Sequence, residues 1–125
     1  MVVALVDDLL FGSRIRAAAE RTGRPIAFAK RETLMDAVAA TPPHLVVVDL
    51  DRSQMDPMAA IRQLRAHPDA AISRVPIVAY VSHVRGDLID AAREAGATLV
   101  LARSAFVAKL PELMADAPTE KTRAL

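Results

Sequence analysis

Side chains that can take part in phosphate chemistry follow four strand-like apolar runs of this 125-residue chain. The runs cover residues 2–6, 45–48, 77–81 and 98–102, and the polar residues directly after them are Asp7 and Asp8, Asp49, Ser82 and Arg103. If the runs are neighbouring parallel strands, these residues meet at the carboxyl edge of one sheet, where open α/β sheets bind their ligands. The sequence therefore predicts carboxylates, a hydroxyl and a cation in one crevice.

The carboxylates of Asp7, Asp8 and Asp49 would need a positive charge close by. Two like charges about 4 Å apart repel by ~1 kcal/mol in water and by ~4 kcal/mol at the effective dielectric constant of a protein surface. Mg²⁺ would fit, because it prefers one or two carboxylates, waters and a phosphate. Asp49 could also attack phosphorus as a nucleophile. The plainer alternative is that one of the acidic pair caps a helix and that Asp49 caps its own loop.

Ser82 and Arg103 are candidates for a binding site because of their joint position after neighbouring strands. A hydroxyl and a guanidinium beside three carboxylates could hold the oxygens of a phosphoryl group. Taken singly, a serine after a strand is ordinary and an arginine is usually a solvated surface charge. His83 could act as a base or a ligand, or it could be a packed or half-exposed imidazole.

Helix-like stretches separate the strands, which is the pattern of repeated βαβ units around a parallel sheet. The expected helices cover residues 9–22, 31–40, 57–66 and 87–95 and a last stretch from about residue 105, and a weaker strand covers residues 26–30. Gly23 and Gly96 predict helix ends, and Asp56 followed by Pro57 predicts an N-cap and a first helical residue. Residues 67–75 form a linker in this interpretation. Pro111 must lie early in the last helix or kink it.

The composition predicts one domain, residues 1–117, with a frayed tail over residues 118–125. Hydrophobic residues make up 53% of the chain but aromatic residues only 3%, so the core must be aliphatic. Sixteen Lys and Arg against fifteen Asp and Glu leave a formal charge of +1, which gives no field to recruit nucleic acid or a membrane surface. The chain has no cysteine, and its first apolar run is too short to span a membrane. We expect a cytoplasmic protein.

From residue 2 to about residue 114 the chain resembles the receiver domain of two-component response regulators. The acidic pair, the segment from Asp49 to Pro57, the strand that ends at Ser82 and the residues 95–97 before the last strand match that family in order and spacing. The resemblance implies an α/β fold of the flavodoxin-like type: a doubly wound, five-stranded parallel sheet with strand order 2-1-3-4-5.

The resemblance also implies a phosphoacceptor and a metal site. Asp49 would accept a phosphoryl group from a histidine kinase or a phosphotransfer protein of a phosphorelay. Asp8 would bind Mg²⁺ directly, Asp7 would bind it through water, and the backbone carbonyl of Asp51 would complete the protein ligands.

Ser82 and Arg103 would each contact an oxygen of the phosphoryl group. A receiver domain is not an enzyme beyond self-catalysed phosphotransfer and dephosphorylation at its aspartate. Its phosphorylation would bias a surface formed by the fourth helix, fifth strand and fifth helix, which would bind an unknown downstream protein or a second copy of the chain. Because no output domain follows in this sequence, we expect it to act alone.

Five positions depart from the family pattern. Arg103 stands where the family has lysine, and Ser53 and Ser104 stand where it has proline. Val100 replaces the switch aromatic, and His83 replaces a small residue. A planar guanidinium is not equivalent to a compact ammonium, and we expect it to form an ion pair with Asp49 or the acidic pair when no metal is bound.

The departures keep a second interpretation open, in which the chain is an atypical receiver that binds a partner without being phosphorylated. In the first interpretation the signal would run through Ser82 and residues 84–86, because Val100 cannot supply an aromatic rotamer change. A small phosphatase or isomerase on the same fold is a third interpretation. No glycine-rich phosphate loop, HExxH or GxSxG motif is present to support a small-molecule enzyme.

Overall fold

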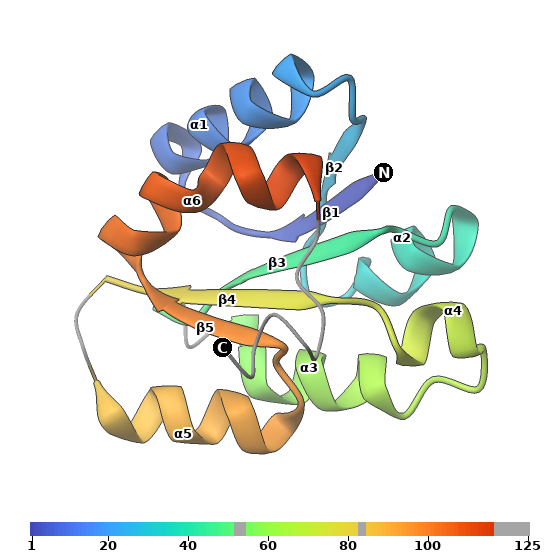
Figure 1. Cartoon of the computed structure of the whole chain (residues 1–125). Helices are drawn as coiled ribbons and strands as arrows, with labels where there is room; N and C mark the ends of the chain where they lie inside the picture. Colours follow the sequence, from blue (N-terminus) through green and yellow to red (C-terminus); the bar gives the residue numbers. More distant parts are fainter. Residues whose placement is uncertain (52–54, 83–84, 117–125) are drawn as a thin grey trace.

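A five-stranded, all-parallel sheet with strand order β2-β1-β3-β4-β5 runs through the protein (Figure 1). The computed structural model describes residues 1–51, 55–82 and 85–116. The strands are β1 (Val2–Leu5), β2 (Ile26–Phe28), β3 (Leu45–Asp49), β4 (Ile77–Val81) and β5 (Leu99–Ala102). The helices within these ranges are α1 (Leu9–Arg21), α2 (Leu34–Ala40), α3 (Pro57–Arg65), α4 (Ala70–Ser73), α5 (Gly86–Ala95) and α6 (Arg103–Ala115). The flavodoxin-like fold and its strand order are confirmed.

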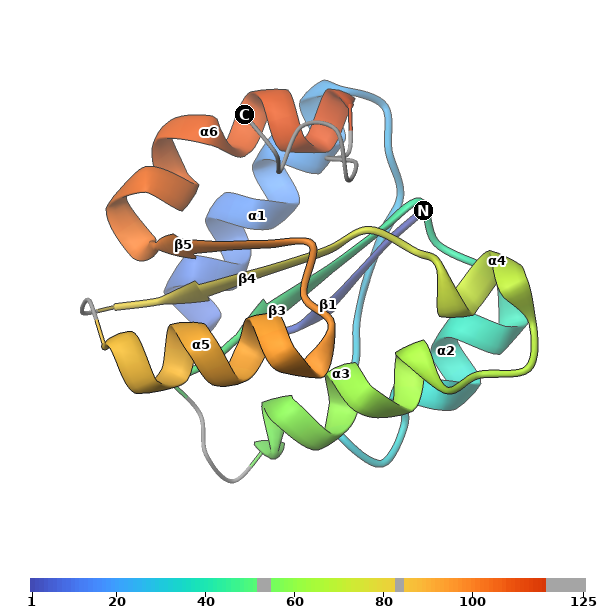
Figure 2. The ribbon, with the colours of Figure 1, turned by 60° about the horizontal axis from the view of Figure 1, so that its bottom comes forward.

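Helices cover both faces of the sheet, as a parallel sheet of fully apolar strands requires. Figure 2 shows α1 and α6 on one face and α2, α3 and α5 on the other. Every residue of β1, β3 and β4 is buried, so the two cores are separated only by the sheet. One core centres on Val46, Val48 and Ile61, and the other on Val47, Ile15 and Phe106. This three-layer packing fixes the carboxyl ends of β1, β3 and β4 relative to one another.

Local chemistry explains most of the element ends. The Asp8 side chain accepts a hydrogen bond from the Phe11 amide at 3.0 Å and caps α1. Gly23 and Gly96 have positive φ angles of 71° and 121°, a conformation that glycine adopts without a steric cost, and they follow α1 and α5 as predicted. The strand β2 and helix α2 are shorter than predicted, because the residues between them form a turn in which the Lys30 amide donates to Thr33 Oγ1 at 2.9 Å.

The structure differs from the prediction in the linker and in details at the starts of two helices. The linker contains the short helix α4, which Asp69 caps by accepting from the Ala71 amide at 2.9 Å, so the predicted fourth and fifth helices are α5 and α6. Asp56 is the N-cap of α3 and Pro57 its first residue, as predicted, but Asp56 has a left-handed conformation (φ 44°) and its side chain makes no capping bond. The helix α6 starts at Arg103 and continues past Pro111 to Ala115.

The Arg65 side chain joins α3 to three other segments. Its guanidinium donates to the backbone carbonyls of Gly96 (2.8 Å), Ser73 (3.0 Å) and Val75 (2.6 Å) and to Thr98 Oγ1 (3.2 Å). These bonds hold the amino ends of β4 and β5 against α3, far from the predicted site.

Some expectations fall on residues that the structure does not describe. They concern Ser53, His83, Val84 and the predicted tail, residues 118–125. None of the described helices has the length and apolar character that a bilayer crossing requires.

Candidate functional site

The register of the sheet brings the predicted site residues to one edge. Leu5 pairs with Val48, Asp49 with Tyr80, and Val81 with Ala102. The chain segments that leave β1, β3, β4 and β5 therefore start side by side. At this edge, contacts join the polar side chains of Asp8, Asp51, Ser82 and Arg103, and the Asp49 side chain accepts from the Asp51 amide.

Asp49 is the buried member of the group, with a relative exposure of 1%. Its Oδ1 atom accepts a hydrogen bond from the Asp51 amide at 2.8 Å. Its Oδ2 atom is buried and has no hydrogen-bond partner among the described residues, and the same is true of the neighbouring Tyr80 hydroxyl. Burial raises the pKa of Asp49 above its ordinary value, and the negative charge of Asp51 raises it further. The Asp51 amide, the Tyr80 hydroxyl and the Arg103 charge act in the opposite direction and lower this pKa, but they do not cancel the rise. Asp49 is thus a carboxylate with one unsatisfied oxygen at the end of the central strand.

Arg103 is the cation of the site. One of its terminal nitrogens lies 3.6 Å from Asp8 Oδ2 and 4.0 Å from Asp51 Oδ2. The expected ion pair with the acidic pair is therefore present through Asp8, and the contact with Asp51 was not predicted. The guanidinium carbon also lies 4.3 Å from the centroid of the Phe11 ring and 5.6 Å from that of Tyr80, distances at which a cation is attracted to an aromatic face.

Three of the four aromatic side chains of the protein gather beneath Arg103. The ring centroids of Phe11 and Tyr80 are 4.8 Å apart, those of Tyr80 and Phe106 are 4.7 Å apart, and those of Phe11 and Phe106 are 5.9 Å apart. We call this cluster the aromatic platform. It was not predicted, although Tyr80 lies two residues before Ser82 in a strand and so belongs to the same face of the sheet.

The side chain of Asp51 bridges the segments that follow β3 and β4. The Ser82 amide lies 2.9 Å from Asp51 Oδ2 and 3.1 Å from Oδ1, and the Ser82 hydroxyl donates to Oδ1 at 3.0 Å. The sequence prediction concerned only the backbone carbonyl of Asp51. Its carboxylate accepts hydrogen bonds from both donors that Ser82 offers, and this side-chain role is what sequence reasoning missed.

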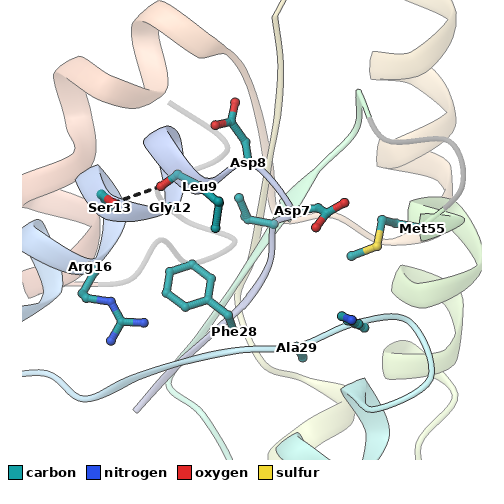
Figure 3. Close-up of a pocket in the computed structure, with 11 residues that line it drawn as sticks. Asp7, Asp8, Leu9, Gly12, Ser13, Arg16, Phe28, Ala29 and Met55 are labelled. Atoms are coloured by element: carbon teal, nitrogen blue, oxygen red, sulfur yellow. Dashed lines mark hydrogen bonds between the residues drawn. The ribbon is translucent and has the colours of Figure 1, made fainter.

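Asp7 and Asp8 point in different directions (Figure 3). Asp8 combines its helix-capping bond with the Arg103 contact, whereas Asp7 is exposed and extends toward Met55. Asp7 lines a cavity of about 380 Å³ between α1, the end of β2 and Met55. Arg16 crosses the Phe28 ring in its wall, with 5.0 Å from the guanidinium carbon to the ring centroid.

The donor chemistry of the site suits a hard divalent cation. Asp8 and Asp49 supply carboxylate oxygens, and the buried, unpartnered Oδ2 of Asp49 lacks the partner that a cation would provide. Within the described residues, no three carboxylate or imidazole side chains lie close enough together to form a ready-made metal site. Arg103, at its distance of 3.6 Å from Asp8, would compete with a cation for that carboxylate.

Comparison with known proteins adds a family context to this geometry. No protein-family model matches the chain. The sensory/regulatory protein RpfC of Xanthomonas campestris is 32% identical over 85 residues, which are 68% of this chain. The matched segment is 12% of the length of that curated relative, so the activity of the whole relative does not transfer to this chain.

Solved structures share the fold at low sequence identity. A response regulator from Hahella chejuensis superimposes with a TM-score of 0.79 at 19% identity, over 90% of each chain. The Mn²⁺-bound form of the response regulator Rcp1 superimposes with a TM-score of 0.75 at 13% identity, over 92% of this chain and 91% of the other. The chain therefore has the fold of response regulator receiver domains.

Proposed function

We propose that this chain is a response regulator receiver domain that accepts a phosphoryl group on Asp49. The observation that carries the proposal is the Asp49 carboxylate itself, buried at the end of the central strand with one oxygen unpartnered. Asp8, Asp51, Ser82 and Arg103 surround it on a fold shared with response regulators. The donor would be a phosphohistidine of a histidine kinase or of a phosphotransfer protein.

In this reaction Asp49 Oδ2 attacks phosphorus, the bond between phosphorus and the histidine nitrogen breaks, and an aspartyl phosphate and a free imidazole result. The Ser82 hydroxyl and the Arg103 guanidinium are the donors available for the oxygens of the bound phosphoryl group. The buried position of Asp49 keeps bulk water away from the new acyl phosphate. The chain is then a substrate and switch, with catalysis limited to its own phosphorylation and dephosphorylation.

Mg²⁺ or Mn²⁺ is part of the proposal. Asp8 and Asp49 would hold the ion, with the Asp51 carbonyl and, through water, Asp7. When bound, the ion neutralises charge on the carboxylates and on the transferring phosphoryl group. The Mn²⁺-bound response regulator Rcp1, which has the same fold, supports this assignment.

The output would be a protein contact. Phosphorylation would bias the surface formed by α5, β5 and α6, and a downstream protein or a second copy of the chain would bind there. The near-zero net charge argues against nucleic acid as the partner.

The proposal is tested by incubating the protein with acetyl phosphate and Mg²⁺ and measuring its intact mass. We expect the mass of one phosphoryl group to be added to the wild type, and none to Asp49→Asn. The exposed carboxylate of Asp90 on α5 provides a matched control, because Asp90→Asn should be phosphorylated like the wild type. A wild type that stays unmodified at saturating donor and metal would contradict the proposal.

A second candidate function is a phosphorylation-independent interaction module. The observation that favours it is the environment of Asp49, because burial raises the pKa of this carboxyl and so works against the ionised form that must attack phosphorus. A partner that binds the wild type and Asp49→Asn equally, in a protein that acetyl phosphate does not modify, would establish this function instead.

A further inference from the structure

The Asp51 carboxylate accepts hydrogen bonds from donors that would otherwise be available to a phosphoryl group on Asp49. Ser82 contributes its amide and its hydroxyl to the two oxygens of Asp51 at 2.9–3.1 Å. Arg103 approaches the same carboxylate at 4.0 Å. A hydroxyl and a guanidinium are also the groups that would bind the oxygens of a phosphoryl group on Asp49. Both are therefore already next to an anion that belongs to the chain.

The position of Asp51 is set by Asp49 itself. The Asp51 amide donates to Asp49 Oδ1 at 2.8 Å, so the backbone turns directly over the acceptor carboxylate and presents the Asp51 side chain to Ser82. The side chain of Asp51 is 25% exposed and that of Arg103 is 32% exposed, so both stay accessible from solvent. An anion that is tethered two residues from the acceptor competes at a high effective concentration with any external anion.

We propose that Asp51 is an internal occupant of the phosphoryl-binding position, and that phosphorylation of Asp49 exchanges the bonds from Ser82 to Asp51 for bonds from Ser82 to the phosphoryl group. This inference rests on the proposed function and adds a regulation to it. The unphosphorylated protein already joins the segments after β3 and β4, so Ser82 has no need to move in from solvent. Phosphorylation instead releases the Asp51 side chain, which the new negative charge repels.

The bridge can be tested without phosphorylation. We expect hydrogen exchange of the Ser82 amide, followed by NMR, to be roughly tenfold faster in Asp51→Ala than in the wild type, because the amide loses its acceptor. Asp90→Ala removes an exposed carboxylate from α5 and should leave this rate unchanged. Equal Ser82 exchange in Asp51→Ala and the wild type would overturn the inference.

The second test asks whether the Asp51 carboxylate occupies the phosphoryl-binding position, and it measures the rate at which acetyl phosphate and Mg²⁺ modify Asp49. Asp51→Ala should be modified severalfold faster than the wild type, and Asp51→Asn should lie between them, since its amide is uncharged but keeps one acceptor oxygen for Ser82. Equal rates for Asp51→Ala and Asp51→Asn would mean that charge alone matters, and would overturn occupancy. Rates no faster than that of the wild type would overturn it as well.

The two experiments separate this inference from the proposed function. If neither the wild type nor the Asp51 variants are modified at Asp49, the proposed function is wrong, and so is the proposed exchange of hydrogen bonds. The hydrogen exchange of the Ser82 amide still shows in that case whether Asp51 and Ser82 are hydrogen-bonded. If Asp51→Ala is modified and the wild type is not, both the acceptor role of Asp49 and the occupancy by Asp51 are supported.

Discussion

Replacing Asp49 by asparagine should stabilise the protein at neutral pH, although it removes the proposed phosphoacceptor. Asparagine is nearly the same size as aspartate and its carbonyl oxygen can still accept the Asp51 amide. The change therefore removes a charge that is 1% exposed and leaves the packing of β3 in place. It is a direct test of the environment that the structure gives to Asp49.

The size of this stabilisation follows from opposing contributions to the free energy of the buried Asp49 carboxylate. Moving a carboxylate out of water costs several kcal/mol, and the nearby Asp51 charge adds to that cost. One hydrogen bond from the Asp51 amide returns about 1.5–3 kcal/mol. The Tyr80 hydroxyl and Arg103 also favour the charged carboxylate, and each returns a smaller amount. Because the resulting pKa of Asp49 is raised, the balance is unfavourable. We expect Asp49→Asn to increase the free energy of unfolding by about 1–2 kcal/mol at pH 7.

The effect should depend on pH in a direction that the raised pKa determines. Between the unfolded pKa and the raised folded pKa of Asp49, the folded protein binds more protons than the unfolded chain does. The free energy of unfolding of the wild type therefore falls as the pH rises through this interval. The advantage of Asp49→Asn should be small near an unfolded pKa of about 3.9, grow with pH, and become constant above the folded pKa.

Urea denaturation followed by circular dichroism at several pH values, without divalent cations, would measure this difference. Asp90→Asn, an exposed change on α5, controls for the general loss of one negative charge. An Asp49→Asn protein that is less stable than the wild type at pH 7, or a difference that does not vary with pH, would refute the reasoning.

Three further predictions concern side chains around the site and the core. Arg65→Met should lower the free energy of unfolding, measured by urea denaturation, by about 3–5 kcal/mol, because four acceptors lose their donor. The control Arg62→Met changes an exposed arginine of the same helix and should alter this free energy by less than about 0.5 kcal/mol. Leu9 and Leu10 are 90% and 85% exposed beside the acidic pair, and we expect a histidine kinase to contact them. Leu9→Ser with Leu10→Ser should therefore slow phosphotransfer from a histidine kinase but not from acetyl phosphate, and equal slowing with both donors would contradict this contact. Tyr80→Phe removes a buried hydroxyl that has no hydrogen-bond partner among the described residues but that opposes the raised pKa of Asp49. These effects on stability oppose each other, so thermal unfolding at pH 7 should show a change of less than about 1 kcal/mol in either direction.

The sequence predicted the fold because its apolar runs are unambiguous. The strands β1, β3 and β4 are buried on both faces, and apart from the terminal Asp49 of β3 and the hydroxyl of Tyr80 in β4 they contain no polar side chain that could suggest another element. The glycines after α1 and α5 were equally informative, because both take positive φ angles. The helix α4 was not predictable from periodicity, since four residues complete only about one turn.

The site was predictable as a set of residues and not as a set of contacts. Strand ends determine which polar residues share the carboxyl edge, and this logic placed Asp8, Asp49, Ser82 and Arg103 at one edge of the sheet. Asp7, which was predicted with them, extends toward Met55 instead. It could not reveal which donor binds which acceptor, because that depends on the turn after β3. The Asp51 amide and carboxylate both act in this turn, and a sequence pattern does not specify the direction of an exposed side chain.

Two departures from the receiver pattern have a common explanation in the aromatic platform. A guanidinium is planar and stacks on aromatic rings, which an ammonium does not do in the same way, and Arg103 lies over Phe11 and beside Tyr80. The platform thus supports an arginine at a position where the family has lysine, and it holds the guanidinium within reach of both Asp8 and Asp51. Val100, in place of the switch aromatic, is nearly buried on the opposite face of β5, in the core beneath α5. The aromatic platform therefore lies on the face of the sheet that α1 and α6 cover, where it positions the guanidinium of Arg103, whereas Val100 lies on the opposite face.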